Sequence, residues 1–173
     1  MQCGLLQPIT RREGRMKAKD VMEPITETLS PETTLKEAVN RMKVARRGEG
    51  WTGVKGMIVL DDGKLAGIVS IKDILRAIIP SYMRLTELGE FTWDGMLEEM
   101  TKKVAGKKVG EVMTRDVITV SEDAPLMECA DLMVKHSLQR LPVLDKDKRV
   151  VGMVYIRDLY QAIVQALLDK EGE

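Results

Sequence analysis

The chain has 173 residues, enough for one ordinary domain or two small ones, and hydrophobic residues make up 44% of it. Aromatic residues account for only 3%, so aliphatic side chains and the twelve methionines must fill the core. Lys and Arg number 27 and Asp and Glu also 27, a balance that argues against nucleic acid as a partner. Because no apolar run approaches the roughly 20 residues of a membrane span, we expect a cytoplasmic protein with no membrane partner.

The first fifteen residues carry neither a periodic hydrophobic pattern nor the apolar core of a secretory signal. Clear organisation begins at Met16. We expect residues 1–15 to be a disordered tail, or the product of a start assigned too early, with Met16 as the true beginning. Their basic residues favour a solvated tail over a polyanion contact.

The elements from Met16 onward follow one order. Ser30 and Pro31 predict a helix start, because serine caps helices and proline suits the first helical turn. The apolar residues that follow have the spacing of one helix face: Leu35, Ala38, Val39 and Met42. Residues 57–60 and 65–70 predict two strands joined by a turn. Asp73 is then expected to open a closing helix.

The segment between residues 81 and 108 contains a further helical stripe. Its apolar residues are Met96, Leu97, Met100 and Val104, and Gly106 ends it. We expect this helix to pad the rest of the chain or to face a second subunit.

The remainder of the chain repeats the first part in the same order. Val21-Met22 recurs as Val112-Met113, and the segment 67–73 (Gly-Ile-Val-Ser-Ile-Lys-Asp) recurs as 152–158 (Gly-Met-Val-Tyr-Ile-Arg-Asp). We therefore divide the chain into a tail (1–15), repeat 1 (16–80), a helical inter-repeat segment (81–108) and repeat 2 (109–170). Each repeat reads strand, helix, strand, strand, helix, which predicts an α/β fold. A unit of about sixty residues is marginal alone, which argues that the copies pack together.

Two aspartates stand at equivalent strand-to-helix turns, Asp73 in repeat 1 and Asp158 in repeat 2. A carboxylate can accept two hydrogen bonds from the vicinal diol of a ribose, and the N–H groups of a helix start favour phosphate. Ser70, three residues before Asp73, can add a hydroxyl. The alternative is that both aspartates simply cap their helices.

The repeated motifs resemble those of the cystathionine-beta-synthase (CBS) domain family. The pattern is Val-Met near the start, Thr-Val-Ser before a helix, Leu-Pro-Val-Leu-Asp, and Gly-hydrophobic-Val-x-x-x-Asp. The resemblance implies a tandem pair, or Bateman module: two βαββα repeats packed with pseudo-two-fold symmetry, with three-stranded sheets flanked by helices. In that family, clefts between the repeats bind AMP, ADP, ATP or S-adenosylmethionine, and the modules form dimers.

The resemblance implies a binding position for a set of residues in each copy. In repeat 1 they are Thr28, Val54, Lys55, Gly56, Ser70 and Asp73. In repeat 2 they are Thr119, Leu138, Gln139, Arg140, Tyr155 and Asp158. Lys72 and Arg157 are added as candidates for phosphate contact, because their positive charges neighbour the two aspartates. Tyr155 stands where the family prefers Ser or Thr, and repeat 1 departs from the pattern between Val44 and Lys55, where we expect a flexible loop. The two sites therefore need not be equivalent.

No residue set indicates catalysis. His136 is the sole histidine, and the two cysteines, Cys3 and Cys129, have neither disulfide nor metal-ligand spacing. We expect no enzyme activity, no metal and no bound cofactor. The expected function is a regulatory homodimer, formed through its helices, that senses AMP, ADP or ATP, with S-adenosylmethionine second, and signals to an effector protein. The alternative is a ligand-free dimeric scaffold.

Overall fold

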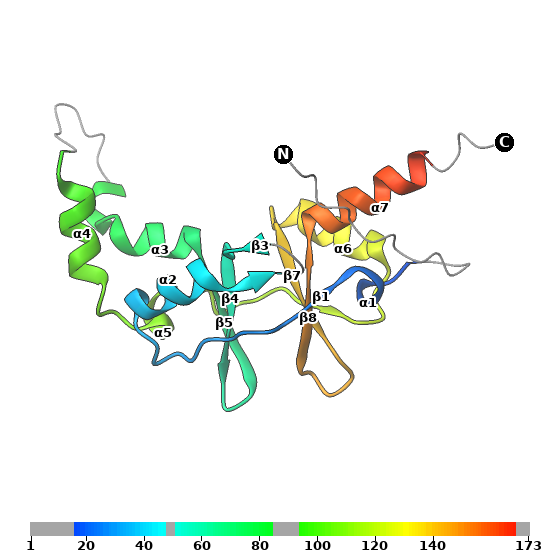
Figure 1. Ribbon diagram of the computed structural model, residues 1–173, viewed down its shortest axis with the longest axis horizontal. Coiled ribbons are helices and arrows are strands. Elements are labelled where there is room, and N and C mark those ends of the chain that lie inside the picture. The colour runs from blue at the N-terminus through cyan, green and yellow to red at the C-terminus, as the bar shows by residue number, and fades with distance from the viewer. Residues whose placement is uncertain (1–15, 48–50, 85–93, 169–173) are drawn as a thin grey trace. The chain divides into compact units, whose positions relative to one another are not determined.

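The computed structural model describes residues 16–47, 51–84 and 94–168 (Figure 1). The chain forms two compact units. One runs from Glu27 to Val117 and is called the central unit below. The other combines the residues up to Thr26 with those from Ile118 onward and is called the composite unit. Each sequence repeat therefore contributes its first residues to the unit that contains most of the other repeat.

The sheet of the composite unit has four strands in the order β1-β8-β7-β6. Strands β7 (Arg140–Leu144) and β8 (Val150–Tyr155) form an antiparallel hairpin. Strand β6 (Val120–Ser121) runs parallel to β7, and β1 (Glu23–Pro24) runs antiparallel to β8. The helices are α1 (Ala18–Val21), α6 (Leu126–Lys135) and α7 (Ile156–Leu168). Residues from strands and helices share one core that includes Cys129, Leu141, Val143 and Val154.

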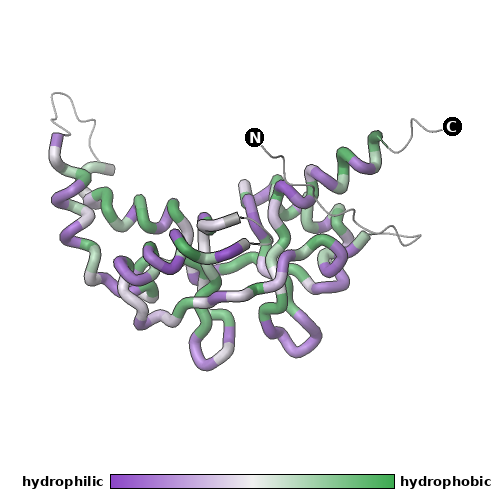
Figure 2. Tube along the Cα trace, viewed as in Figure 1, coloured by the Kyte–Doolittle hydropathy of each residue, from purple (hydrophilic) through white to green (hydrophobic). Residues whose placement is uncertain are grey.

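The central unit repeats this arrangement. Strands β4 (Gly56–Asp61) and β5 (Lys64–Ser70) form the antiparallel hairpin. Single bridges take the places of the outer strands: Leu29 pairs in parallel with Val59, and Thr114 pairs antiparallel with Ile68. Helices α2 (Leu35–Val44) and α5 (Val109–Val112) pack on a core that includes Val59 and Val69. In both hairpins the turns are hydrophilic and the strands hydrophobic (Figure 2).

The remaining elements belong to the central unit. Helix α3 (Ile71–Ile78) follows β5 directly, and the short helix η1 (Ser81–Arg84) comes next. Helix α4 (Met96–Val104) lies within the inter-repeat segment and contacts α3. Strands β2 (Arg46–Arg47) and β3 (Trp51–Thr52) pair where the sequence suggested a flexible loop; residues 48–50 between them lie outside the described residues.

The α/β class, with helices flanking sheets, is confirmed, and the structure corrects several local expectations. The sheets are not three-stranded, because the start of the other repeat adds β1 in the composite unit and Thr114 in the central unit. Helix α2 begins at Leu35 rather than at Ser30, and Thr34 caps it by accepting a hydrogen bond from the Glu37 N–H. Residues 1–15 lie outside the described residues.

Residues 16–24, at the start of repeat 1, and residues 107–114, which span the start of repeat 2, are each called a start segment. In the composite unit the Ala18 N–H donates to the Ala124 carbonyl at 2.8 Å and the Lys19 N–H to the Glu122 carbonyl at 3.0 Å. The equivalent bonds in the central unit run from Val109 to the Thr33 carbonyl at 2.8 Å and from Gly110 to the Pro31 carbonyl at 2.9 Å. In the central unit the carbonyls that accept these bonds belong to the turn before α2. Their engagement explains why that helix starts later than Ser30 and Pro31 suggest.

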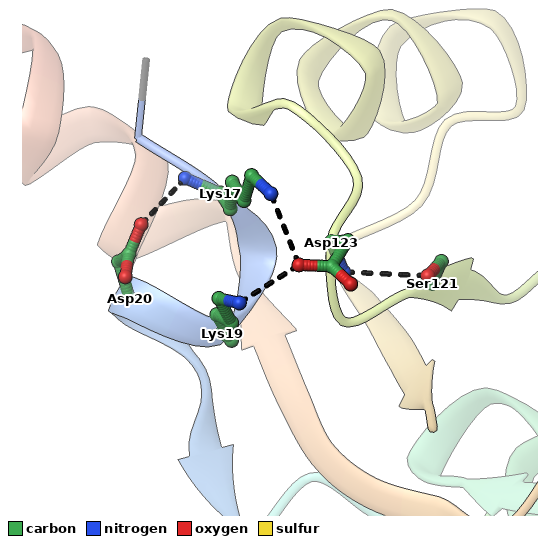
Figure 3. Close-up of polar contacts among 5 residues, drawn as sticks. All are labelled: Lys17, Lys19, Asp20, Ser121 and Asp123. Atoms are coloured by element: carbon green, nitrogen blue, oxygen red, sulfur yellow. Dashed lines mark hydrogen bonds and ion pairs between the residues drawn. The ribbon is translucent and has the colours of Figure 1, made fainter. Parts of the chain in front are cut away.

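An ion pair accompanies each of these docked start segments. The Lys17 and Lys19 ammonium groups converge on Asp123 Oδ1 at 3.0 and 2.8 Å (Figure 3). The equivalent pair in the central unit joins Lys108 to Glu32. The duplication therefore extends to the contacts that hold the start segments.

Within the described ranges, none of the helices has the length and apolarity that crossing a membrane requires.

Candidate functional site

The centre of the candidate site in the central unit is Asp73, the third residue of α3. Ser70 is the N-cap of that helix, and the two residues form a capping box. Asp73 Oδ2 accepts hydrogen bonds from the Ser70 N–H at 2.8 Å and from the Ser70 hydroxyl at 2.6 Å. Helix α3 thus begins two residues before the aspartate that was expected to open it.

The other carboxylate oxygen of Asp73 is also engaged. Its Oδ1 accepts from the Thr114 hydroxyl at 3.0 Å and from the Arg76 guanidinium at 3.1 Å. A carboxylate accepts about four hydrogen bonds, so these contacts together approach the capacity of the group. The side chain is only 4% exposed. Asp73 is therefore not the N-cap of α3 but the N3 member of its capping box, and a ligand that donates to this carboxylate must compete with protein donors.

The equivalent aspartate of the composite unit, Asp158, is the third residue of α7 and is 7% exposed. Its Oδ2 accepts from the Tyr155 N–H at 2.9 Å, as Asp73 does from Ser70. The Arg157 guanidinium lies 3.4 Å from Asp158 Oδ1 and donates a 2.8 Å hydrogen bond to Glu23 Oε1. Arg157 thus bridges two carboxylates.

The residues at which β4 and β7 begin, called the strand entries below, lie beside these helix starts. In the central unit Gly56 pairs with Ser70, and the Ile71 N–H donates to the Lys55 carbonyl at 3.1 Å. In the composite unit Arg140 pairs with Tyr155, and the Ile156 N–H donates to the Gln139 carbonyl at 3.0 Å. The structure therefore brings these four predicted residues to the start of the closing helix in their own unit.

The other predicted residues lie around this centre. Val54 and Leu138 precede the strand entries, and both donate backbone hydrogen bonds to the ends of the helices before them. Thr28 precedes Leu29, which pairs with Val59 on β4, and Thr119 precedes Val120, which pairs with Val143 on β7. Both threonines therefore lie near later residues of these strands than the residues at which the strands begin. Lys72 is exposed on the first turn of α3. That these residues bind a nucleotide stays a prediction.

Sequence reasoning missed Glu23 and Thr114, which contact the aspartate or its neighbouring arginine. Both follow directly after a Val-Met pair, so the repeat alignment makes them equivalent. Neither was singled out, because each lies far along the chain from the aspartate it approaches.

The described residues contain no group of three or more His, Cys, Asp or Glu side chains that could hold a metal ion. Burial raises the pKa of the Cys129 thiol, which keeps it protonated at neutral pH and a poor nucleophile. His136 is exposed at the C-cap of α6.

Two relatives match long stretches of the chain. It is 31% identical over 159 residues to an inosine-5'-monophosphate dehydrogenase of Methanocaldococcus jannaschii, covering 90% of this chain and 26% of the dehydrogenase. It is 36% identical over 125 residues to the protein MJ1426 of the same organism, covering 64% of this chain and 74% of the relative. The chain thus spans about a quarter of the dehydrogenase and most of the smaller relative.

Among solved structures, the chain is similar to CBSX2 in complex with AMP, a CBS-pair protein of Arabidopsis thaliana. The TM-score is 0.61 at 26% identity, and the match covers 87% of this chain and 97% of CBSX2. The family model for the CBS domain matches residues 18–80 and again 109–165. Both copies of the repeat are thus recognised, and the chain belongs to the CBS domain family as a tandem CBS pair.

Proposed function

We propose that this CBS pair is a regulatory module, not an enzyme, that binds an adenine nucleotide at the start of a closing helix. The observation that carries the proposal is the Ser70–Asp73 capping box, which sets a hydroxyl and a carboxylate beside the Lys55–Gly56 strand entry. The likeness to CBSX2, whose structure holds AMP, supports the ligand class. AMP, ADP and ATP are the first candidates, and S-adenosylmethionine is the second.

The relay begins at Asp73. A ribose diol that hydrogen-bonds to this carboxylate competes with the Thr114 hydroxyl, which belongs to the start segment of repeat 2. Because a ligand shifts an equilibrium only by its differential affinity for two states, this competition couples ligand binding to the docking of that segment. An effector protein then binds one of these two states of the segment in preference to the other.

The composite unit offers a second site at Tyr155 and Asp158. Tyrosine replaces the serine of the capping box there, and Arg157 lies beside the carboxylate. We propose that this site is the weaker of the two for AMP, because its capping residue places no small hydroxyl where Ser70 has one.

We also propose that the module is a cytoplasmic homodimer formed through its closing helices. The apolar side chains Ile71 and Leu75 of α3 are exposed, as are the equivalent Ile156 and Tyr160 of α7. Duplicated apolar faces of this kind suit the self-complementary interface of a symmetric dimer. The second candidate function is a ligand-free scaffold. It is favoured by these exposed apolar faces and by the protein partners that both aspartates already have.

A thermal-shift series with AMP, ADP, ATP and S-adenosylmethionine separates the two functions. A ligand of the folded state raises the midpoint of unfolding, and the stabilisation grows as RT ln(1 + [L]/Kd). Asp73→Ala is expected to abolish most of the AMP shift, and Asp158→Ala to reduce it less. An Asp61→Ala variant, altered at the exposed end of β4, is the control. No shift with any of the four ligands at millimolar concentration favours the scaffold.

A further inference from the structure

Thr114 and Arg76 both donate to Asp73 Oδ1, but the two side chains differ in how firmly they are held. The backbone of Thr114 forms two hydrogen bonds of 2.9 Å with Ile68, which keep its hydroxyl beside the carboxylate. Arg76 lies one helical turn after Asp73 on α3, and its side chain is 63% exposed. A long exposed side chain can leave its partner at little cost, because water replaces the hydrogen bond that it loses. Arg76 is therefore the first of the two donors that a ligand hydroxyl displaces from this oxygen.

The contact between Arg76 and Asp73 is an ion pair as well as a hydrogen bond, with 3.1 Å between Arg76 Nη1 and Asp73 Oδ1. Its two sides are unequal, because the Asp73 side chain is 4% exposed whereas most of the Arg76 side chain faces water. A ribose hydroxyl that takes the place of the guanidinium supplies a hydrogen bond but no charge. Because charge-assisted hydrogen bonds are the stronger ones, a ligand that offers only hydroxyls regains part of the interaction that it displaces, not all of it.

The displaced guanidinium stays close to the site. Arg76 and Asp73 belong to the same helix, so the arginine side chain can move while its backbone keeps its place. In AMP, ADP and ATP the phosphate is attached to the same ribose whose diol would bind the carboxylate. An arginine guanidinium binds phosphate through paired N–H···O contacts. The phosphate of a nucleotide can therefore restore the ion pair that its ribose displaces, whereas adenosine, which has no phosphate, cannot.

Arg76 has no charged counterpart in repeat 2. The alignment that places Ala77 opposite Ala162 also places Gln161 opposite Arg76. The side chain of glutamine is neutral, so Gln161 cannot form an ion pair with a carboxylate or with a phosphate. Discrimination that depends on this exchange of partners is therefore confined to the central unit.

We infer that Arg76 is a specificity-determining residue of the central unit: it occupies Asp73 Oδ1 in the free protein and transfers to the phosphate of a bound nucleotide. The inference rests on the proposed function. The ion pair with Asp73 then works against adenosine, which must break it without replacing it, and leaves binding of the phosphorylated nucleotides favourable.

The test is calorimetric binding of adenosine and AMP to Asp158→Asn and to the double variant Asp158→Asn/Arg76→Gln. The Asp158 change weakens the site of the composite unit, so that binding reports on the central one. We expect Arg76→Gln to raise adenosine affinity about threefold, because the ion pair that adenosine must break is gone, and not to raise AMP affinity. The preference for AMP over adenosine then falls about threefold or more. The single variant Arg76→Gln repeats the comparison without the Asp158 change.

Lys103→Gln is the matched control, because it removes a cation of similar exposure, together with its ion pair to Glu99, from α4 of the same unit. It should leave the AMP preference unchanged, and a fall as large as that of Arg76→Gln overturns the inference. Arg76→Lys keeps the charge and should retain part of the preference; a complete loss contradicts an ionic exchange.

The AMP preference also separates failure of this inference from failure of the proposed function. A preference that Arg76→Gln leaves unchanged or raises, whether the two affinities stay the same or shift together, overturns the inference while the proposed function stands. Failure of the wild-type protein and of every variant to bind either adenosine or AMP overturns both.

Discussion

Gly67 shows how closely a start segment approaches the hairpin of the other repeat. A Cβ atom at this position would lie 2.7 Å from the Met113 Sδ and 2.7 Å from the Thr114 carbonyl oxygen. The sulfur can rotate away, but the carbonyl oxygen is part of the Thr114–Ile68 bridge. The equivalent Gly152 meets Met22 in the same way. The glycines of this motif therefore serve packing of the Val-Met segment.

Gly67→Ala is expected to lower the free energy of unfolding by about 1–3 kcal/mol, because the added methyl group forces the start segment away. Chemical denaturation measures the change. Gly106→Ala, where a Cβ would meet nothing within 4 Å, is the control and should leave stability unchanged or slightly raised. Similar losses in both variants would show that close packing is not the reason for the glycine.

Ser70 connects stability to the candidate site. Ser70→Ala removes the 2.6 Å hydrogen bond to Asp73 and the N-cap oxygen of α3. We expect a loss of about 1 kcal/mol in unfolding free energy, typical of a lost cap, together with weaker AMP binding. Ser30→Ala, in the exposed turn before α2, is the comparison variant for AMP binding. Unchanged AMP affinity in Ser70→Ala would remove this hydroxyl from the site.

At the scale of elements, the docking of the start segments was the feature least predictable from the sequence. Repeat order, strand and helix sequence, and the positions of Asp73 and Asp158 were all readable from periodicity and self-similarity. The exchange of residues 16–24 and 107–114 was not, because pairing between distant segments leaves no periodic signal. Thr114 and Glu23 were missed for the same reason, and so was the late start of α2, whose preceding carbonyls bind the start segment.

The ion pairs of Asp123 give one start segment a measurable pH dependence. The hydrogen bonds and charges of Lys19 and Lys17 lower the pKa of Asp123 from 3.8 to about 2. A lowered carboxyl pKa contributes stability that is fully present above pH 4 and is lost as the pH falls from 3.8 toward 2. Salt weakens the contribution, since these groups are exposed.

Asp123→Asn is therefore expected to be less stable than the wild-type protein at pH 7 and low salt, and the difference should shrink as the pH falls from 3.8 toward 2. Hydrogen exchange of the amides of residues 18–22 should rise in the variant. Asp131→Asn, which removes the Lys135 ion pair within α6, is the control and should leave those amides protected. A stability difference that persists unchanged at pH 2 would contradict the ionic origin.

At the scale of the whole molecule, the exposed apolar side chains of the closing helices argue for a partner. Ile163 of α7 is 53% exposed, and Leu97 of α4 is 63% exposed. If the closing helices form the dimer, Ile163→Glu should shift the protein toward monomer in light scattering, because it buries a charge at the interface. Leu97→Glu should leave the mass unchanged. A monomer for Leu97→Glu with an unchanged mass for Ile163→Glu would instead place the interface on α4.

The most direct measurement is calorimetric titration of the wild-type protein with AMP. The CBS-pair fold, the Ser70–Asp73 capping box and the likeness to CBSX2 together predict saturable binding that Asp73→Ala abolishes at the tighter site. Absence of heat and of any thermal shift at millimolar AMP, ADP, ATP and S-adenosylmethionine would contradict a nucleotide-binding regulatory module.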